Sequence, residues 1–171
     1  MNARNTNRIF ITGNAGSGKT TLAKLISARL KTPFYSLDSI VWQHGWQVTP
    51  LDERNQLISR LVKKDFWIIE GVSKAVLDSA TTIIFLDMSR SLCFKRLILR
   101  NYKYLFKSRP ELPENCPEIK IIRKLIPIVW NFNKLVRPIV LSHLEKNNSL
   151  KGVYHIKTTE DLAYLYKRFE L

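Results

Sequence analysis

Three glycines, a lysine and a threonine hydroxyl fall within one stretch of eight residues, GNAGSGKT, near the start of the chain. Glycines let successive backbone N–H groups turn toward a bound oxyanion, where a Cβ atom would block the approach. Lys19 can then reach the β- and γ-phosphates of a nucleotide, while the Thr20 hydroxyl can ligate Mg²⁺. The spacing predicts a phosphate-binding loop for a nucleoside triphosphate. The residues expected to contact the nucleotide are Gly13, Asn14, Ala15, Gly16, Ser17, Gly18, Lys19, Thr20 and Thr21.

Two carboxylates, Asp38 and Glu70, end apolar runs that read as strands. In a parallel sheet the carboxyl ends of the strands meet at the ligand crevice, so both side chains are expected to face the nucleotide. Asp38 could accept a proton from a substrate hydroxyl or hold a Mg²⁺-bound water, and the alternative is a helix cap. Glu70 is expected to contact Mg²⁺ through water, and the alternative is a structural ion pair. Thr20 and Glu70 are therefore the predicted metal residues.

Arginines form a second group of candidates. Arg96 and Arg100 are four residues apart, so a helix places them on one face, with Arg90 on an adjacent turn. Guanidinium groups neutralise the charge that phosphoryl transfer spreads over oxygens. Arg109 and Arg123 lie farther along, in or near a segment expected to act as a lid. Because runs of charge are usually solvated, we expect one or two of these arginines to contact phosphate, and we assign Arg96 and Arg100 to catalysis with Lys19 and Asp38.

Alternating strands and helices must position these residues. The continuous apolar runs predict parallel strands at 8–13, 33–38, 66–71, 81–87 and 151–157. Helical spacing follows the glycine-rich loop as far as Pro33, and Thr49, Pro50 and Asp52 predict another helix start. Thr159 is expected to cap the last helix. The chain is therefore expected to be an α/β protein of one domain, 1–171, with a parallel sheet covered on both faces.

The strand pattern is suspended between about residues 88 and 150. A basic amphipathic helix is expected from Ser89 to about Lys107, and RPELPENCPE (109–118) is expected to be a loop because of its three prolines. Residues 118–147 should be helical, with kinks or two or three separate pieces at Pro127 and Pro138. We expect 88–150 to be a helical lid or insert.

The chain of 171 residues carries a formal net charge of +14, and this charge is uneven. Residues 88–137 hold twelve Lys or Arg against three acids, a net +9. Such a field attracts phosphates on nucleotides, nucleic acid or membrane lipid, and composition does not choose among them. A GTPase is not expected, because Asn133-Lys134 is followed by Leu135 and Val136 instead of the guanine motif. The lack of a signal peptide or a spanning apolar run, and two cysteines without metal-ligand spacing, predict a cytoplasmic protein with no membrane partner.

Several segments together resemble the adenylate-kinase-related bacterial topology modulation proteins of the FlaR type. They are GNAGSGKTTLAKLIS, LDSIVWQHGW, WIIEGVSK, RPELPENCPE and WNF…RP, and the resemblance runs from about residue 8 to 147. It implies a P-loop NTPase three-layer sandwich with strand order 2-3-1-4-5, ATP and Mg²⁺. It also implies that Asp38 lies on the substrate side and that Arg96 and Arg100 lead into the lid. The chain departs from the family where Glu70-Gly71-Val72-Ser73 replaces Asp-Gly-Asn-Tyr.

These patterns leave three functions open. The leading hypothesis is an ATP-dependent kinase for a small-molecule acceptor, such as a nucleotide, a nucleoside or another hydroxyl or phosphate compound. The second is a nucleic-acid-binding ATPase or regulator of DNA topology that uses the basic 88–137 segment, although the sequence shows no helix-turn-helix, zinc finger or aromatic RNP signature. The third is a nucleotide-binding protein without turnover, suggested by the altered segment at Glu70. The acceptor and the oligomeric state do not follow from the sequence.

Overall fold

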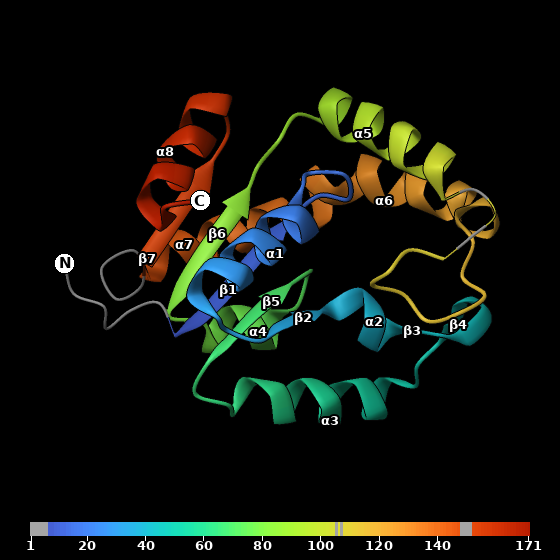
Figure 1. Cartoon of the computed structure of the whole chain (residues 1–171), viewed down its shortest axis with the longest axis horizontal. Helices are drawn as coiled ribbons and strands as arrows, with labels where there is room; N and C mark the ends of the chain where they lie inside the picture. The colour runs from blue at the N-terminus through green and yellow to red at the C-terminus, as the bar shows by residue number, and fades with distance from the viewer. Residues whose placement is uncertain (1–6, 105, 107, 148–151) are drawn as a thin grey trace.

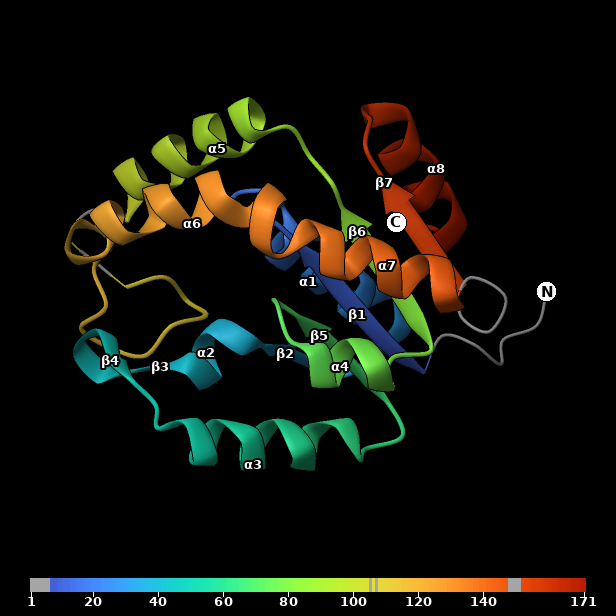
Figure 2. The same cartoon turned by 180° about the vertical axis from the view of Figure 1, so that it is seen from behind.

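A parallel sheet with helices on both faces forms the body of the molecule, seen from opposite sides in Figure 1 and Figure 2. The computed structural model describes residues 7–104, 106, 108–147 and 152–171. The strands are β1 (Arg8–Gly13), β2 (Phe34–Ser36), β5 (Trp67–Glu70), β6 (Thr82–Leu86) and β7 (Gly152–Ile156). All are parallel, in the order β2-β5-β1-β6-β7. This confirms the five-stranded sheet of order 2-3-1-4-5; Lys151, the first residue of the last expected strand, lies outside the described residues.

Alternation along the central strands divides the apolar core into two layers. Ile9 and Ile11 of β1 face α1 (Lys19–Leu30) and α8 (Thr159–Phe169), where they belong to a cluster that includes Leu22, Ile26 and Leu165. Phe10 points to the other face, which α4 (Lys74–Ser79) and α7 (Arg137–Asn147) cover. Side chains that alternate along a strand point to opposite faces, so a strand buried on both sides must be apolar throughout. The three-layer architecture follows from this.

The substrate-side segment contains short elements that the sequence patterns did not predict. After β2 come α2 (Leu37–Val41), β3 (Trp42–Gln43), a 3₁₀ turn (His44–Trp46) and β4 (Gln47–Val48), with β3 and β4 paired antiparallel. The helix α3 (Leu51–Val62) follows. The expected cap at Thr49 is not formed, since Pro50 precedes the helix without a side-chain hydrogen bond and Thr49 is buried.

Between β6 and β7 the described residues form mainly helices, separated by the loop 108–117. This part of the chain contains α5 (Arg90–Lys103), a 3₁₀ turn (Glu118–Lys120), α6 (Ile122–Leu135) and α7. Ser89 caps α5 by accepting a hydrogen bond from the Leu92 amide. The helix ends before the expected Lys107, which lies outside the described residues. No helix of the described part of the chain is long and apolar enough to cross a bilayer.

Two details differ from the expected helix ends. Pro127 lies inside α6 and does not divide it; the division falls at Val136, just before Pro138, which occupies the first turn of α7. A proline in a first turn sacrifices no helical hydrogen bond, so Pro138 suits a helix start. The cap of α8 is Thr158 and not Thr159. Its hydroxyl accepts from the Asp161 amide at 3.1 Å, and the Asp161 carboxylate accepts from the Thr158 amide at 3.0 Å. This capping box needs its acid three residues after the cap, which selects Thr158.

Candidate active site

The glycine-rich loop joins β1 to α1 and has a backbone that requires glycine. Gly16 has φ +80°, and a Cβ atom there would lie 2.4 Å from the carbonyl oxygen of Cys93, at the start of α5. The Ser17 hydroxyl is buried and has no hydrogen-bond partner among the described residues. The amino end of α1, with its positive dipole and unpaired N–H groups, begins at Lys19. A backbone cradle, a buried hydroxyl without a partner and a helix amino end together fit a polyphosphate.

Hydrogen bonds from three side chains brace this loop. Lys19 Nζ donates to the carbonyl oxygen of Asn14 at 2.9 Å, across the loop. Arg96 Nη1 donates to the carbonyl oxygen of Ser17 at 2.9 Å. The side-chain amide of Asn14 donates to the carbonyl oxygen of Val129 in α6 at 3.0 Å. The helices α5 and α6 are thereby attached directly to the loop.

Thr20 and Glu70, the two predicted metal residues, are in contact. The Thr20 hydroxyl donates to Oε1 of Glu70 at 3.2 Å, and the Ser36 hydroxyl donates to the same oxygen at 2.5 Å. Glu70 is buried at the end of β5. Mg²⁺ prefers oxygen ligands and is usually held by one or two protein groups together with phosphate oxygens and waters. The oxygen pair of Thr20 and Glu70 fits that donor set; no group of three His, Cys, Asp or Glu side chains suited to a metal occurs in the described part of the chain.

An ion-pair network lies on the other side of the site. Arg109 Nη2 lies 3.5 Å from Oδ2 of Asp38, and Arg109 Nε lies 2.6 Å from Oε1 of Glu118. Arg100 Nη2 lies 3.7 Å from Oε2 of Glu118, which is completely buried. Burial, followed by the charge of Arg109, lowers the pKa of the Arg100 guanidinium despite the nearby carboxylates. Glu118 thus holds two arginines beside Asp38.

The proline-rich loop 109–118 reaches this position because it packs against the 3₁₀ turn His44–Trp46 and against α1. Trp46 Nε1 donates to the carbonyl oxygen of Pro117 at 2.9 Å, and the Cys116 thiol donates to the carbonyl oxygen of Gln43 at 3.4 Å. Lys24 of α1 forms an ion pair with Glu111. Burial alone would raise the pKa of Glu111, but the hydrogen bond from Lys24 and further polar contacts outweigh burial and lower it. The loop therefore forms one wall of the site.

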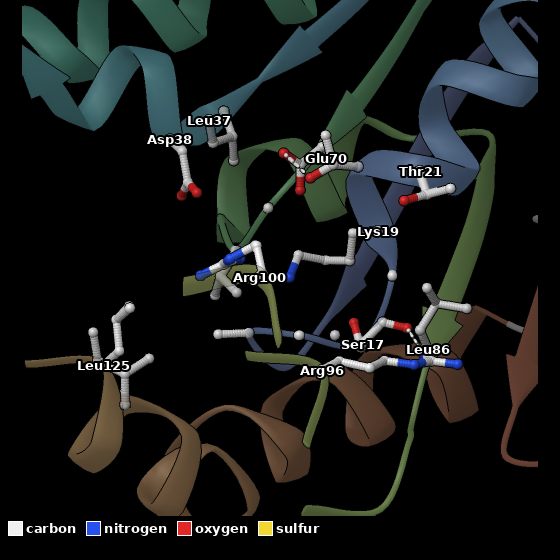
Figure 3. A pocket seen from close by; sticks show the side chains of 18 of the residues that line it. Ser17, Lys19, Thr21, Leu37, Asp38, Glu70, Leu86, Arg96, Arg100 and Leu125 are labelled. Carbon is white, nitrogen blue, oxygen red and sulfur yellow. Dashed lines mark hydrogen bonds between the residues drawn. The ribbon is translucent and has the colours of Figure 1, made fainter. Parts of the chain in front are cut away.

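One cavity of about 1140 Å³ joins the two sides. Figure 3 shows Lys19 and Arg100 extending toward its centre, with Asp38 and Glu70 on the opposite edge. Asn14 is the one predicted site residue that does not line the cavity, because its side chain is turned to α6. The predicted residues that do line it are Gly13, Ala15, Gly16, Ser17, Gly18, Lys19, Thr20, Thr21, Asp38, Glu70, Arg96 and Arg100. Arg90 and Arg123 are not part of its lining; Arg90 lies 4.9 Å from the ring centre of Trp130, and Arg123 is exposed.

The structure adds lining residues that the sequence did not single out, above all Lys24 and Glu111. Arg109, which was expected in or near the lid, also lines the cavity. Trp42 and Trp46 also line the cavity, with ring centres 5.2 Å apart in an edge-to-face arrangement. In the sequence, the prolines of 109–118 predicted a loop. They gave no indication that this loop packs against the cavity and forms one of its walls.

A phosphate-binding loop between the first strand and helix of a parallel sheet of order 2-3-1-4-5 decides the fold. The chain has a P-loop NTPase fold. Comparison with solved structures agrees. A shikimate kinase from Bacteroides thetaiotaomicron is 16% identical, with a TM-score of 0.50 over 96% of this chain and 99% of that chain. A shikimate kinase from Acinetobacter baumannii in complex with shikimate is 15% identical, with a TM-score of 0.55 over 96% and 93%.

At such identities the likeness concerns the fold and not the substrate. No protein-family model matches the chain, and neither does any curated protein sequence. The likeness to these two kinases is therefore a likeness of fold.

Proposed function

We propose that the protein is a phosphotransferase that moves the γ-phosphoryl group of ATP to a small-molecule acceptor. The observation that carries the proposal is the continuous cavity. It is lined both by the phosphate loop with the Thr20–Glu70 pair and by Asp38, Arg100 and Arg109. A nucleotide on the loop would leave the second side of the same cavity for an acceptor.

The nucleotide side consists of the loop amides, Lys19, Thr20 and Glu70. The amides and Lys19 would hold the phosphates, and Lys19 would exchange its bond to Asn14 for phosphate oxygens. Thr20 and Glu70 would hold Mg²⁺, directly or through water. Bound ATP with Mg²⁺ supplies the transferable phosphoryl group and neutralises charge on its oxygens.

On the acceptor side, Asp38 is the group suited to take a proton. Its side chain is 49% exposed, so it remains open to an acceptor while Arg109 holds its carboxylate from one side. A carboxylate within hydrogen-bonding reach of an acceptor hydroxyl can remove its proton as the phosphoryl group is transferred. Arg100 and Arg96 supply positive charge on the same cavity wall.

The fold supports a kinase, since both solved structures reported above are kinases with small-molecule substrates. We retain four finer predictions as part of this proposal: the relation to the topology modulation proteins, the use of ATP and Mg²⁺, a cytoplasmic location, and lid movement of 88–150. The acceptor class stays open among nucleotides, nucleosides and other hydroxyl or phosphate compounds.

A coupled assay that follows ADP release tests the proposal, with ATP, Mg²⁺ and a panel of nucleosides, nucleotides, sugars and hydroxy acids. We expect one acceptor to stimulate ADP release, and we expect Lys19→Ala to abolish it. Asp38→Asn should lower kcat by about 10²–10⁴ while leaving ATP affinity unchanged. Lys63→Ala, at an exposed lysine after α3, is the matched control and should keep full turnover. Slow hydrolysis that no acceptor stimulates, or bound ATP that stays intact throughout, would overturn the proposal.

A further inference from the structure

The exposed surface of the basic segment 88–137 carries several cationic side chains and few carboxylates. Among its three acids, Glu118 is completely buried and Glu111 is held by Lys24. Glu114 is therefore the one exposed carboxylate in the described part of 88–137. The same part exposes cationic side chains: Arg90, Lys95, Lys120, Arg123, Lys124 and Lys134.

The helix α5 also exposes apolar side chains in a stripe. Ile98 is 66% exposed, Leu99 64% and Tyr102 86%, and Phe106 beyond the helix is 80% exposed. Ile98 and Leu99 lie four and three residues before Tyr102, so the three side chains lie along one side of α5. Leu97, by contrast, is buried in the core. The stripe therefore points away from the molecule, with Lys95 at its near end.

The helix α6 carries exposed apolar residues of its own. Ile126 is 53% exposed and Trp130 62%, and the guanidinium of Arg90, at the start of α5, lies over the Trp130 ring. The two helices run side by side in both views (Figures 1 and 2). Aromatic and aliphatic groups on this helix pair are thus mixed with cations.

The charge and the apolar side chains of α5 and α6 indicate which partner this surface binds: a second copy of the chain, nucleic acid or a lipid bilayer. A second copy would bring the same cations against it, so like charges would oppose a symmetric dimer. Nucleic acid would use the cations and aromatic rings, but it gains little from exposed isoleucine and leucine. An anionic bilayer surface attracts the cations and accepts the apolar side chains at the boundary between headgroups and acyl chains.

We propose that the outer surface of α5 and α6, with Phe106, adsorbs to membranes rich in anionic lipid headgroups. The expectation of no membrane partner was based on the lack of a spanning segment, and adsorption needs none. The inner side of α5 directs Arg96 and Arg100 to the cavity, so an adsorbed molecule would present the back of its active-site wall to the lipid. The proposal does not depend on kinase activity.

Vesicle flotation tests the proposal, with the full chain mixed with phosphatidylcholine vesicles that contain or lack phosphatidylglycerol. We expect flotation only with the anionic vesicles, and we expect it to weaken as salt rises. Tyr102→Ser combined with Phe106→Ser should weaken binding about tenfold or more. Tyr164→Ser removes a similarly exposed ring, 65% exposed on α8, and should leave binding unchanged.

A pair of charge variants completes the test. Lys95→Gln with Arg123→Gln should weaken binding about fivefold per lost cation, while Arg60→Gln with Lys63→Gln near the end of α3 should have no comparable effect. The altered residues are exposed, so unchanged melting temperatures will show that the variants fold. No flotation at low salt, equal binding to neutral vesicles, or binding insensitive to the Tyr102 and Phe106 changes would overturn the proposal. Binding of duplex or single-stranded DNA through these residues, without vesicle binding, would also overturn it and assign the surface to nucleic acid.

Discussion

The hydroxyl of Thr20 donates a hydrogen bond of 3.2 Å to Oε1 of Glu70, which connects the first turn of α1 to the carboxyl end of β5. Removing the negative charge while keeping the shape tests whether this pair holds Mg²⁺. Glu70→Gln should raise the Mg²⁺ concentration needed for half-maximal turnover or lower the activity, in either case by about 10- to 100-fold. A Mg²⁺ titration of ADP release at saturating ATP measures the effect. Glu53→Gln, on exposed α3, is the control. An unchanged Mg²⁺ dependence in Glu70→Gln would show that Glu70 is a structural acceptor for Thr20 and Ser36 alone.

Alanine substitutions at two glycines, Gly16 and Gly45, can distinguish the cost of backbone strain from the cost of a steric clash. Gly16 and Gly45 have similar φ values of +80° and +70°, but a Cβ atom at Gly16 would lie 2.4 Å from Cys93 O, whereas one at Gly45 would meet nothing within 4 Å. Gly45→Ala should therefore cost about 1–2 kcal/mol from the left-handed conformation alone. Gly16→Ala should cost a further 1–3 kcal/mol or so, because the start of α5 must move. Urea denaturation and ATP-binding calorimetry measure both, and we expect ATP binding to be lost in Gly16→Ala alone. Equal unfolding free energies for the two variants would contradict the close approach of loop and helix.

Asp87, just after the end of β6, forms an ion pair with Arg137 of α7, and we expect this pair to stabilise the protein in an acid-sensitive way. Arg137 donates to both carboxylate oxygens of Asp87, and His155 lies 2.8 Å from one of them. Burial would raise the pKa of Asp87, but the hydrogen bonds from Arg137 and His155 outweigh burial and hold the pKa below the ordinary 3.8. Because the folded pKa is depressed, this stabilisation is fully present above about pH 4 and is lost as pH falls through the folded pKa.

Asp87→Asn should therefore destabilise the protein by about 2 kcal/mol at pH 7 and reduce its loss of stability between about pH 4 and pH 2. Asp65→Asn is the control, because Asp65 is 84% exposed and its pair with Arg8 at 3.6 Å should contribute less than about 0.5 kcal/mol. Urea denaturation across this pH range measures both. If both variants keep the acid sensitivity of the original chain, another carboxylate is responsible.

The features that sequence reasoning predicted are local in the chain. The glycine-rich loop occupies eight consecutive residues between a strand and a helix, so one short pattern was enough to predict its structure. The strands at 66–71 and 81–87 are continuous apolar runs, and only a strand buried on both faces suits such a run. Asp38 and Glu70 followed from the same logic, because the end of a strand fixes which edge of the sheet a residue occupies.

The features that were missed depend on contacts between distant segments. Arg109 reaches Asp38 from a loop 71 residues later, and Glu118 is buried only because that loop turns inward. No periodicity marks such a loop, so a glutamate among prolines reads as solvated. The short α2 and the two-residue strands β3 and β4 were missed for a related reason. Elements of this length have little stability of their own and form because they pack against the sheet and the docked loop.

The indole of Trp46 provides the last prediction, since its N–H holds the docked loop through the carbonyl oxygen of Pro117 at 2.9 Å. Trp46→Phe removes this hydrogen bond while keeping an aromatic ring beside Trp42. Losing one such bond costs about 1 kcal/mol, so the loop should leave its docked position about five times more often. Hydrogen exchange followed by mass spectrometry should show faster exchange in peptides covering 109–118, where the Cys116 amide donates to Ser108 and the Glu118 amide to Tyr104.

A loosened loop would also move Arg109 away from Asp38, so the KM of the acceptor should rise about three- to tenfold in Trp46→Phe while the KM of ATP stays unchanged. Trp42→Phe is the matched control, because it alters the other ring of the pair and should leave exchange in 109–118 close to that of the original chain. Faster exchange without a change in acceptor KM would show that the loop wall is not used by the acceptor. Equal exchange in both variants would show that the Trp46 hydrogen bond does not hold the loop. The two measurements therefore separate the docking of the loop from its part in substrate binding.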